Sequence, residues 1–313
     1  SWAGIMSSYG TSLLVIGHEL GHNFGNHHAS FLDCADVTIA DSGCVVYEYG
    51  DGYNIMGNAR PFHFNGPHKE YVGWFEPNNI QTVTSSGTYI LEPIETQTAN
   101  LKVLKIQRYA WDYMYIEYRQ PIGYDTLNIT VGDIYQGALL HSLLSPNKTA
   151  LLDPTPLDNS TSTITLTVGS SFIDPATGTQ ITTSAKTSNS LTLNVSLGKT
   201  DFTAPTVKIT SPLYDATVSG IVVVAADASD ASGIQKVEFY LDGTGIANLL
   251  GADLDAPYGF SWNTLQVANG THYLYVKAYD KSGEPWGVSG NSALDGVMVT
   301  VANAVTPTLT LTP

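Results

Sequence analysis

Apolar residues near the start of the chain follow a helical spacing. They recur every three or four positions over residues 13–20, which predicts one buried face of a helix, and Gly25 is suited to end it in the left-handed conformation. A second, shorter helix is predicted over residues 65–74. There Asn65 can cap the first turn, and Pro67 lies where a missing N–H costs little.

From about residue 78 onward the hydrophobic period changes from helical to two. Residues 163–168 and 190–197 alternate polar and apolar side chains strictly, which predicts half-buried strands. Residues 113–119 are aromatic and β-branched and are also predicted to form a strand. Turn residues separate these runs, so residues 78–199 are predicted to fold as an antiparallel β-sandwich.

A third region begins after a short linker near Pro205. Several short alternating runs over residues 200–303 predict an immunoglobulin-like (Ig-like) sandwich, and residues 304–313 are predicted to be a further linker. The expected fold class is therefore mainly β and multidomain. Residues 1–77 differ from the rest, because they hold both predicted helices and six of the eight histidines.

Charge and hydropathy exclude several classes of partner. Thirteen Lys and Arg against 28 Asp and Glu give a net charge of −15, which argues against nucleic acid and anionic membranes. With 43% hydrophobic and only 13% charged residues, the chain is not a disordered acidic tail. No apolar run approaches the roughly 18 residues of a membrane-spanning helix.

The two cysteines, Cys34 and Cys44, lie ten residues apart. We expect them to form a disulfide, which together with the Thr-, Ser-, Gly- and Asn-rich composition points to an extracellular protein. Free thiols and metal ligation are the alternatives, and the absence of a C-x-x-C spacing speaks against the second.

The segment from His18 to His28 matches H-E-x-x-H-x-x-G-x-x-H at every fixed position. His18 and His22 lie one turn apart on a helix and can share one metal ion, and His28 can return to that ion after the chain turns at Gly25. Three neutral histidines leave one tetrahedral position of zinc open, as in catalytic sites. His27 competes with His28, but only His28 meets the spacing.

Glu19 follows the first histidine and can reach a water molecule on the metal. Zinc lowers the pKa of such a water to about 7, so Glu19 is the expected general base for attack on a peptide carbonyl. Considered singly, each histidine reads more simply as an ordinary helix or loop residue. The complete motif favours the metal site.

With a following Met-containing segment, Tyr53–Gly57, the zinc motif resembles the metzincin clan of zinc endopeptidases. Within the clan the chain is most similar to the gametolysin family and its bacterial relatives. The supporting segments are Ala29, Asp33–Cys34, Cys44, Glu48–Asp51, His63–Asn65, Lys69–Glu70, Gly73–Trp74, Tyr115–Gly123 and Gly137–His141. Residues 205–302 instead resemble the Ig-like modules of secreted bacterial enzymes, through Val207–Pro212, Lys236–Gly243 and Asn269–Tyr273.

The resemblance implies that residues 1–77 are the C-terminal part of an α/β metzincin catalytic unit, with Met56 packed beneath the zinc ligands. Because a substantial subdomain precedes the zinc helix in metzincins, the unit is expected to be N-terminally truncated and to lack much of its substrate cleft. The implied substrates are extracellular proteins or glycoproteins.

Two other functions are kept as alternatives. One is an extracellular binding or adhesion protein with an inactive or incomplete metalloprotease-like unit, whose Ig-like module binds a cell-wall or matrix polymer. The other is a zinc hydrolase acting on bonds other than peptides. Calcium is a weaker expectation at residues 227–230 with Gly233, or at Asp253 with Asp255, where solvated loop acids are the preferred interpretation.

Overall fold

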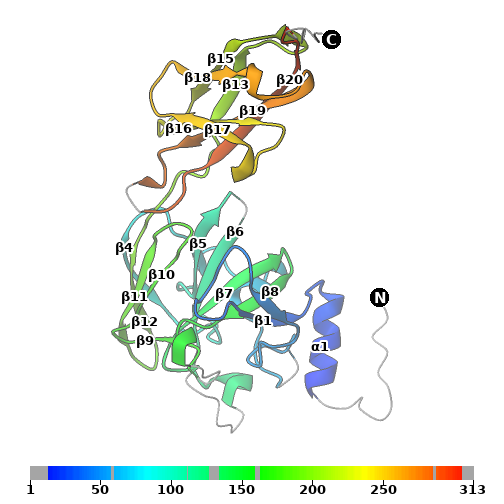
Figure 1. Cartoon of the computed structure of the whole chain (residues 1–313). Coiled ribbons are helices and arrows are strands. Elements are labelled where there is room, and N and C mark those ends of the chain that lie inside the picture. Colours follow the sequence, from blue (N-terminus) through cyan, green and yellow to red (C-terminus); the bar gives the residue numbers. More distant parts are fainter. Residues whose placement is uncertain are drawn as a thin grey trace, which may run out of the picture. The chain divides into compact units, whose positions relative to one another are not determined.

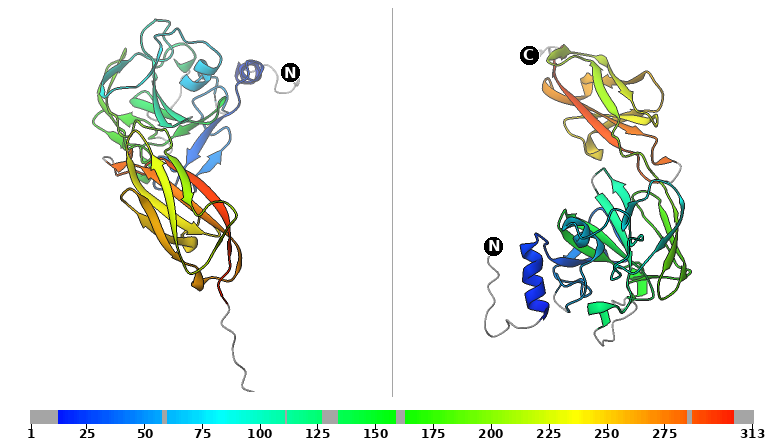
Figure 2. Two further views of the ribbon diagram at one scale, coloured as in Figure 1. Left: turned by 90° about the horizontal axis from the view of Figure 1, so that it is seen from above. Right: turned by 180° about the vertical axis from the view of Figure 1, so that it is seen from behind.

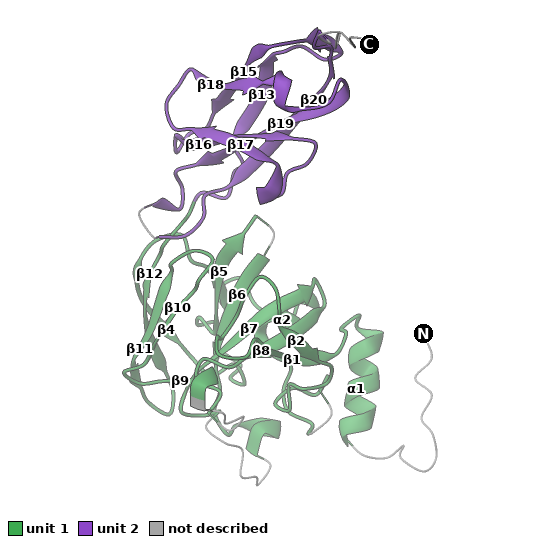
Figure 3. Ribbon diagram, viewed as in Figure 1, with its two compact units in different colours: residues 1–200 green, residues 201–313 purple. Residues whose placement is uncertain are grey.

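The structure, a computed structural model, describes residues 13–57, 60–110, 112–126, 134–158, 163–284 and 287–304. The chain divides into two compact units, residues 1–200 (unit 1) and residues 201–313 (unit 2), which Figure 3 colours separately. Of the linker predicted over residues 304–313, all but the first residue lies outside the described part of the chain.

Unit 1 contains two sheets in its described part. The larger sheet has the order β2-β1-β8-β7-β6-β5-β3, and β9 pairs with β7. Its strands are β1 (Ala29–Asp33), β2 (Val45–Tyr47), β3 (Ile80–Thr82), β5 (Val103–Tyr109), β6 (Asp112–Tyr118), β7 (Gly137–Ser145), β8 (Lys148–Leu152) and β9 (Leu166–Thr167). The smaller sheet has the order β10-β11-β12-β4, formed by β4 (Gly87–Leu91), β10 (Ser171–Ile173), β11 (Gln180–Lys186) and β12 (Leu191–Ser196).

A hydrophobic core joins the two sheets of unit 1. It includes Ile106 and Ile116 from the larger sheet and Leu191 and Leu193 from the smaller one. Leu32, on β1, belongs to the same core, and β1 pairs in parallel with β8. The boundary predicted at 77/78 therefore falls inside one compact unit, because the first 77 residues contribute two strands to the larger sheet.

The helices lie where the sequence predicts them. Helix α1 (Leu13–Asn23) is followed by Gly25 at φ +98°, and Figures 1 and 2 show α1 at the periphery of unit 1, beyond β1. Helix α2 (Gly66–Tyr71) has Asn65 as its N-cap, whose side chain accepts a hydrogen bond from the backbone N–H of His68 at 3.1 Å. Short 3-10 turns cover Gly123–Thr126 and Pro156–Asp158.

The strand predictions are confirmed only in part. Residues 191–196 alternate buried and more exposed positions, as predicted. Of residues 163–168, only Leu166–Thr167 pair as a strand, and Thr165 is buried although the alternation placed it on the wet face. Strand β6 is buried from Met114 to Tyr118, because one face meets the core and the strand also contacts α2.

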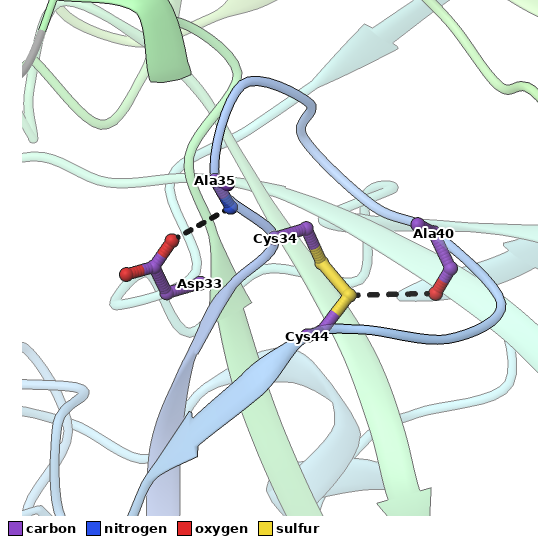
Figure 4. The surroundings of a disulfide bond; sticks show 5 residues. All are labelled: Asp33, Cys34, Ala35, Ala40 and Cys44. Carbon is purple, nitrogen blue, oxygen red and sulfur yellow. Dashed lines mark hydrogen bonds between the residues drawn. A yellow bond between two sulfur atoms is a disulfide. The ribbon is translucent and has the colours of Figure 1, made fainter.

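The disulfide prediction is confirmed. Cys34 and Cys44 are bonded and close a loop beyond β1, where the backbone N–H of Ala35 donates to Asp33 at 2.9 Å (Figure 4). The bond fixes the connection between β1 and β2, two strands that pair antiparallel.

Unit 2 is a sandwich of a three-stranded sheet, β13-β15-β18, and a five-stranded sheet, β14-β20-β19-β16-β17, within the residues described. Its strands are β13 (Thr206–Ser211), β14 (Ala216–Val218), β15 (Ile221–Ser229), β16 (Ile234–Leu241), β17 (Leu249–Asp253), β18 (Tyr258–Asn263), β19 (Gly270–Asp280) and β20 (Ser292–Val301), with 3-10 turns at Ile246–Asn248 and Thr264–Gln266. Phe239, Trp262 and Val276 lie in its core, so the predicted alternation and the Ig-like architecture agree with the structure.

Candidate metal centre

Helix α1 carries the first two histidines of the motif and the glutamate between them. His18 and His22 lie one turn apart with ring centroids 4.8 Å from each other, and Glu19 is partly exposed beside His18. On another face of α1, a Cβ added to Gly21 would lie 2.2 Å from Sδ of Met56, which is fully buried. The glycine therefore lets the helix rest directly on the turn that contains Met56.

The chain leaves α1 through a tight, well-bonded turn. The N–H of Gly25 donates to the carbonyl of His22 at 3.0 Å. Asn147, between β7 and β8, donates from its side chain to the carbonyl of Gly25 at 2.8 Å, and its own carbonyl accepts from the N–H of His27 at 2.8 Å. These bonds hold the exit of the helix against the larger sheet, and the next residue is His28, directly before β1.

The three motif histidines converge. The ring centroid of His28 lies 5.5 Å from that of His18 and 5.0 Å from that of His22. One ligand nitrogen from each ring lies within 4.8 Å of the other two, whereas His27 is exposed and lies outside this group. The spacing suits three ligands around a single ion.

Each of the three imidazoles bonds an oxygen acceptor through Nδ1. The pairs are His18 with the carbonyl of Ile55 at 2.9 Å, His22 with the carbonyl of Asn26 at 2.8 Å and His28 with Oε1 of Glu48 at 2.7 Å. Because an oxygen acceptor requires a proton on Nδ1, the neutral ring presents its lone pair on Nε2. The donor set and its outer partners thus fit a three-histidine zinc site with an open position.

The environment of His18 also favours the neutral form. Burial lowers the pKa of His18, and the nearby His22 and His28 lower it further, although the bond to Ile55 opposes them. A histidine must be unprotonated at the nitrogen that binds metal, so this direction supports ligation.

The turn beneath α1 is fixed by the buried side chains of Asp51 and Asn54, for which the sequence predicted no role of their own. Asp51 accepts from the N–H of Tyr53 at 3.0 Å, and Asn54 accepts from the N–H of Met56 at 2.9 Å. The carbonyl of Met56 in turn accepts from the N–H of Ala29 at 3.0 Å. The position of Met56 is therefore tied to β1, the strand that follows His28.

A buried ion network lies behind this turn. Arg119 donates to Glu117 at 2.7 Å, to Asp125 at 3.1 Å and to the carbonyl of Tyr53 at 2.8 Å. Burial by itself lowers the pKa of Arg119, but the carboxylates of Glu117 and Asp125 raise it overall, so the guanidinium stays charged. The network joins the turn to β6.

Glu48 and Tyr49 were predicted only as part of the family resemblance, with no role of their own. Both contact His28, and Tyr49 has its ring centroid 3.9 Å from that of the imidazole. Their only sequence signal was the position of Glu48–Asp51 before the Met-containing turn. Asn147 carried no signal, because it lies 122 residues from Gly25, the helix exit that it binds.

Other candidate sites are separate from the three histidines. A cavity of about 670 Å³ is lined by Leu13, Leu20, Phe24, Trp74 and other residues, but by none of the three imidazoles. In unit 2, carboxylate oxygens of Asp201, Asp230 and Asp280 lie within 4.8 Å of one another. Of the acids named as calcium candidates, only Asp230 belongs to this group among the residues described.

One family model and several solved structures are similar to parts of the chain. Residues 205–276 match the model of a bacterial Ig domain. The chain is similar to an endo-beta-1,4-mannanase from Thermotoga petrophila, with 17% identity over 33% of this chain and 21% of that one and a TM-score of 0.25. It is also similar to the fibronectin(III)-like modules of Clostridium thermocellum CbhA, with 21% identity over 33% of this chain and all of that one and a TM-score of 0.26. The chain thus spans about a fifth of the mannanase.

No curated protein matches the chain. Among the described helices, none has the length and apolar character needed to cross a membrane. A bacterial Ig domain and a disulfide are both typical of extracellular proteins. Within unit 2, the family match supports a bacterial Ig domain at residues 205–276.

Proposed function

We propose that unit 1 is the zinc-binding part of an extracellular endopeptidase of the metzincin clan, similar to the gametolysin family. The observation that carries the proposal is the convergence of His18, His22 and His28, each with Nδ1 bonded to an oxygen acceptor. Three neutral imidazoles with one open position are the ligand set of catalytic rather than structural zinc.

Each residue of the candidate site would have a distinct role. His18, His22 and His28 would hold zinc through Nε2, and zinc, when bound, supplies Lewis acidity and lowers the pKa of a coordinated water to about 7. A carboxylate oxygen of Glu19 accepts the proton of the attacking water and passes it to the leaving amine. Met56 contacts α1 at Gly21 and keeps the helix at a fixed height above the turn.

The proposal is tested by the hydrolysis of labelled casein by the zinc-loaded chain. Any turnover should disappear on chelation, return with zinc and fall by about 10²–10⁴-fold in Glu19→Gln. His27→Ala is the matched control, because His27 is exposed and outside the histidine cluster, and it should retain activity. A Glu19→Gln chain with full zinc-dependent activity would contradict the assigned mechanism.

A second function is favoured by the bacterial Ig domain at residues 205–276. In this alternative the chain binds a cell-wall or matrix polymer, and unit 1 is inactive or incomplete. Sedimentation of the full chain and of Glu19→Gln with insoluble peptidoglycan distinguishes the two. Equal binding of both chains, without casein hydrolysis by either, would favour the binding function.

A further inference from the structure

The outer partner of His28 differs in kind from those of the other two histidines. His18 and His22 lie on a helix and bond backbone carbonyls. His28 lies on the connection between α1 and β1, and its Nδ1 bonds a side chain, Glu48, at 2.7 Å. The orientation of this third ligand therefore depends on a residue that can be changed without altering any backbone carbonyl.

The larger sheet positions Glu48 for its contact with His28. It follows β2 directly, and its Oε1 lies 3.7 Å from Nζ of Lys148 on β8. The side chain of Glu48 is 54% exposed, and that of His28 is 21% exposed. One carboxylate oxygen of Glu48 thus fixes the edge of the His28 ring. Without this hydrogen bond the edge of the ring is free to rotate or to exchange its tautomer.

Tyr49 covers the face of the same ring. Its ring centroid is 3.9 Å from that of His28 with an interplanar angle of 33°, and 6.0 Å from that of His18. Tyr49 adopts φ +63°, a left-handed conformation that is costly for a bulky residue and that glycine or asparagine adopts more readily. Strained backbone of this kind persists where the surroundings require it and is concentrated at functional sites.

We propose that Glu48 and Tyr49 form a clamp that positions His28 for metal binding, Glu48 at the ring edge and Tyr49 on the ring face. The inference rests on the proposed zinc site and adds two positioning residues to it. Neither residue is assigned contact with the substrate. They hold Nε2 of His28 toward the proposed zinc position, which it shares with His18 and His22.

The test is the zinc affinity of the full chain at one fixed pH, measured by competition with a chromogenic chelator. We expect Glu48→Ala to weaken zinc binding by about 10–100-fold, the range found for outer-shell partners of ligating histidines. Glu48→Gln keeps an oxygen acceptor and should recover part of that loss. Glu76→Ala removes an equivalent charge from an exposed position and should leave zinc affinity unchanged.

A double variant shows whether Glu48 affects zinc binding through His28 or through a general effect on the site. His28→Ala should weaken zinc binding more than Glu48→Ala does. Adding Glu48→Ala to His28→Ala should cause no further loss, because the residue through which Glu48 acts is gone. An additional loss of about tenfold or more in the double variant would overturn the proposed route.

Tyr49→Asn tests the face of the clamp. Asparagine tolerates the left-handed backbone, so the zinc-free variant should unfold at a temperature equal to or above that of the zinc-free parent, while its zinc affinity falls. The absorption bands of bound Co²⁺ should also shift, as the geometry of the third ligand changes. A lower unfolding temperature with unchanged zinc affinity would show a purely structural role and contradict the clamp.

The two proposals fail in different ways. If the unchanged chain binds zinc and the Glu48 and Tyr49 variants bind it equally well, the clamp is wrong and the zinc site stands. If the unchanged chain does not bind zinc, the proposed zinc site is wrong, and the clamp falls with it.

Discussion

The two units of this chain bury their polar groups very differently. In the described part of unit 2 the buried acids are Glu238 and Asp280, and the core consists of alternating apolar residues from two sheets. Unit 1 buries Arg119, Glu117 and Asp125 in one ion network beside the turn that carries Met56. Unit 2 is therefore held mainly by apolar burial, whereas unit 1 also depends on charges that must stay paired.

We attribute the buried polar groups of unit 1 to the candidate metal centre that this unit holds in place. The candidate metal centre takes ligands from a helix and a connection, and both rest on a turn that buried side chains fix. A turn that presents its backbone inside the protein needs polar partners for its N–H and carbonyl groups. The regular sheets of unit 2 satisfy those groups within their own ladders.

The comparison is tested most strongly by removing the charge of Arg119. Arg119→Met removes the buried guanidinium that pairs with Glu117 and Asp125 and should lower the free energy of unfolding of unit 1 by about 3–5 kcal/mol. Calorimetry of the full chain should show this loss in one transition, with the transition of unit 2 in place. Equal shifts of both transitions would contradict the separate behaviour of the units.

Reduction of the disulfide should have a somewhat smaller effect. Cys34 and Cys44, ten positions apart in unit 1, close a short loop, and opening it should lower the stability of that unit by about 2–3 kcal/mol. Chemical denaturation of unit 1, followed with and without reductant, measures the change. The same treatment should leave unit 2 unaffected, since both cysteines of the chain lie in unit 1.

Acidification should lower the stability of unit 1 by less than the two changes above. Burial lowers the pKa of His68 from 6.5 to about 3, so its contribution to stability is present above pH 6.5 and is lost as the pH falls toward 3. Between pH 7 and pH 5 this single group should cost unit 1 about 2 kcal/mol. His68→Gln should reduce the slope of unit 1 stability with pH, and an unchanged slope would contradict the assignment.

His272 in unit 2 should respond in the opposite direction. Burial opposes protonation of His272, but its bond to Asp242 at 2.7 Å raises the pKa overall. Its contribution is therefore complete below pH 6.5 and is lost as the pH rises through the elevated value. His272→Gln should make unit 2 less sensitive to alkalinity, as followed by its thermal transition between about pH 5 and pH 8.

Local patterns predicted those parts of the fold that local physics determines. Helix α1, the Asn65 cap and the alternating strands of unit 2 all follow from residues close together in the sequence. The parallel pairing of β1 with β8 did not, because it joins residues more than a hundred positions apart, and no short-range signal encodes it.

The candidate site shows the same division. The spacing of His18, His22 and His28 was sufficient to place them together, because a helix and one glycine turn determine it. The outer partners were not predicted, since the carbonyls of Ile55 and Asn26 have no side-chain signature. The contact of Glu48 with His28 depends on the antiparallel pairing of β1 with β2, which brings together residues 20 positions apart.

X-ray absorption spectroscopy of the zinc-loaded chain would identify the ligands of the proposed zinc site. We expect one zinc ion with three imidazole nitrogens and an oxygen as its fourth ligand, with Zn–N distances of about 2.0–2.1 Å. The imidazole scattering should drop by about a third in His28→Ala and remain unchanged in His27→Ala. A zinc ion bound mainly by carboxylates, or one whose spectrum is unaffected by His28→Ala, would contradict the proposed zinc site.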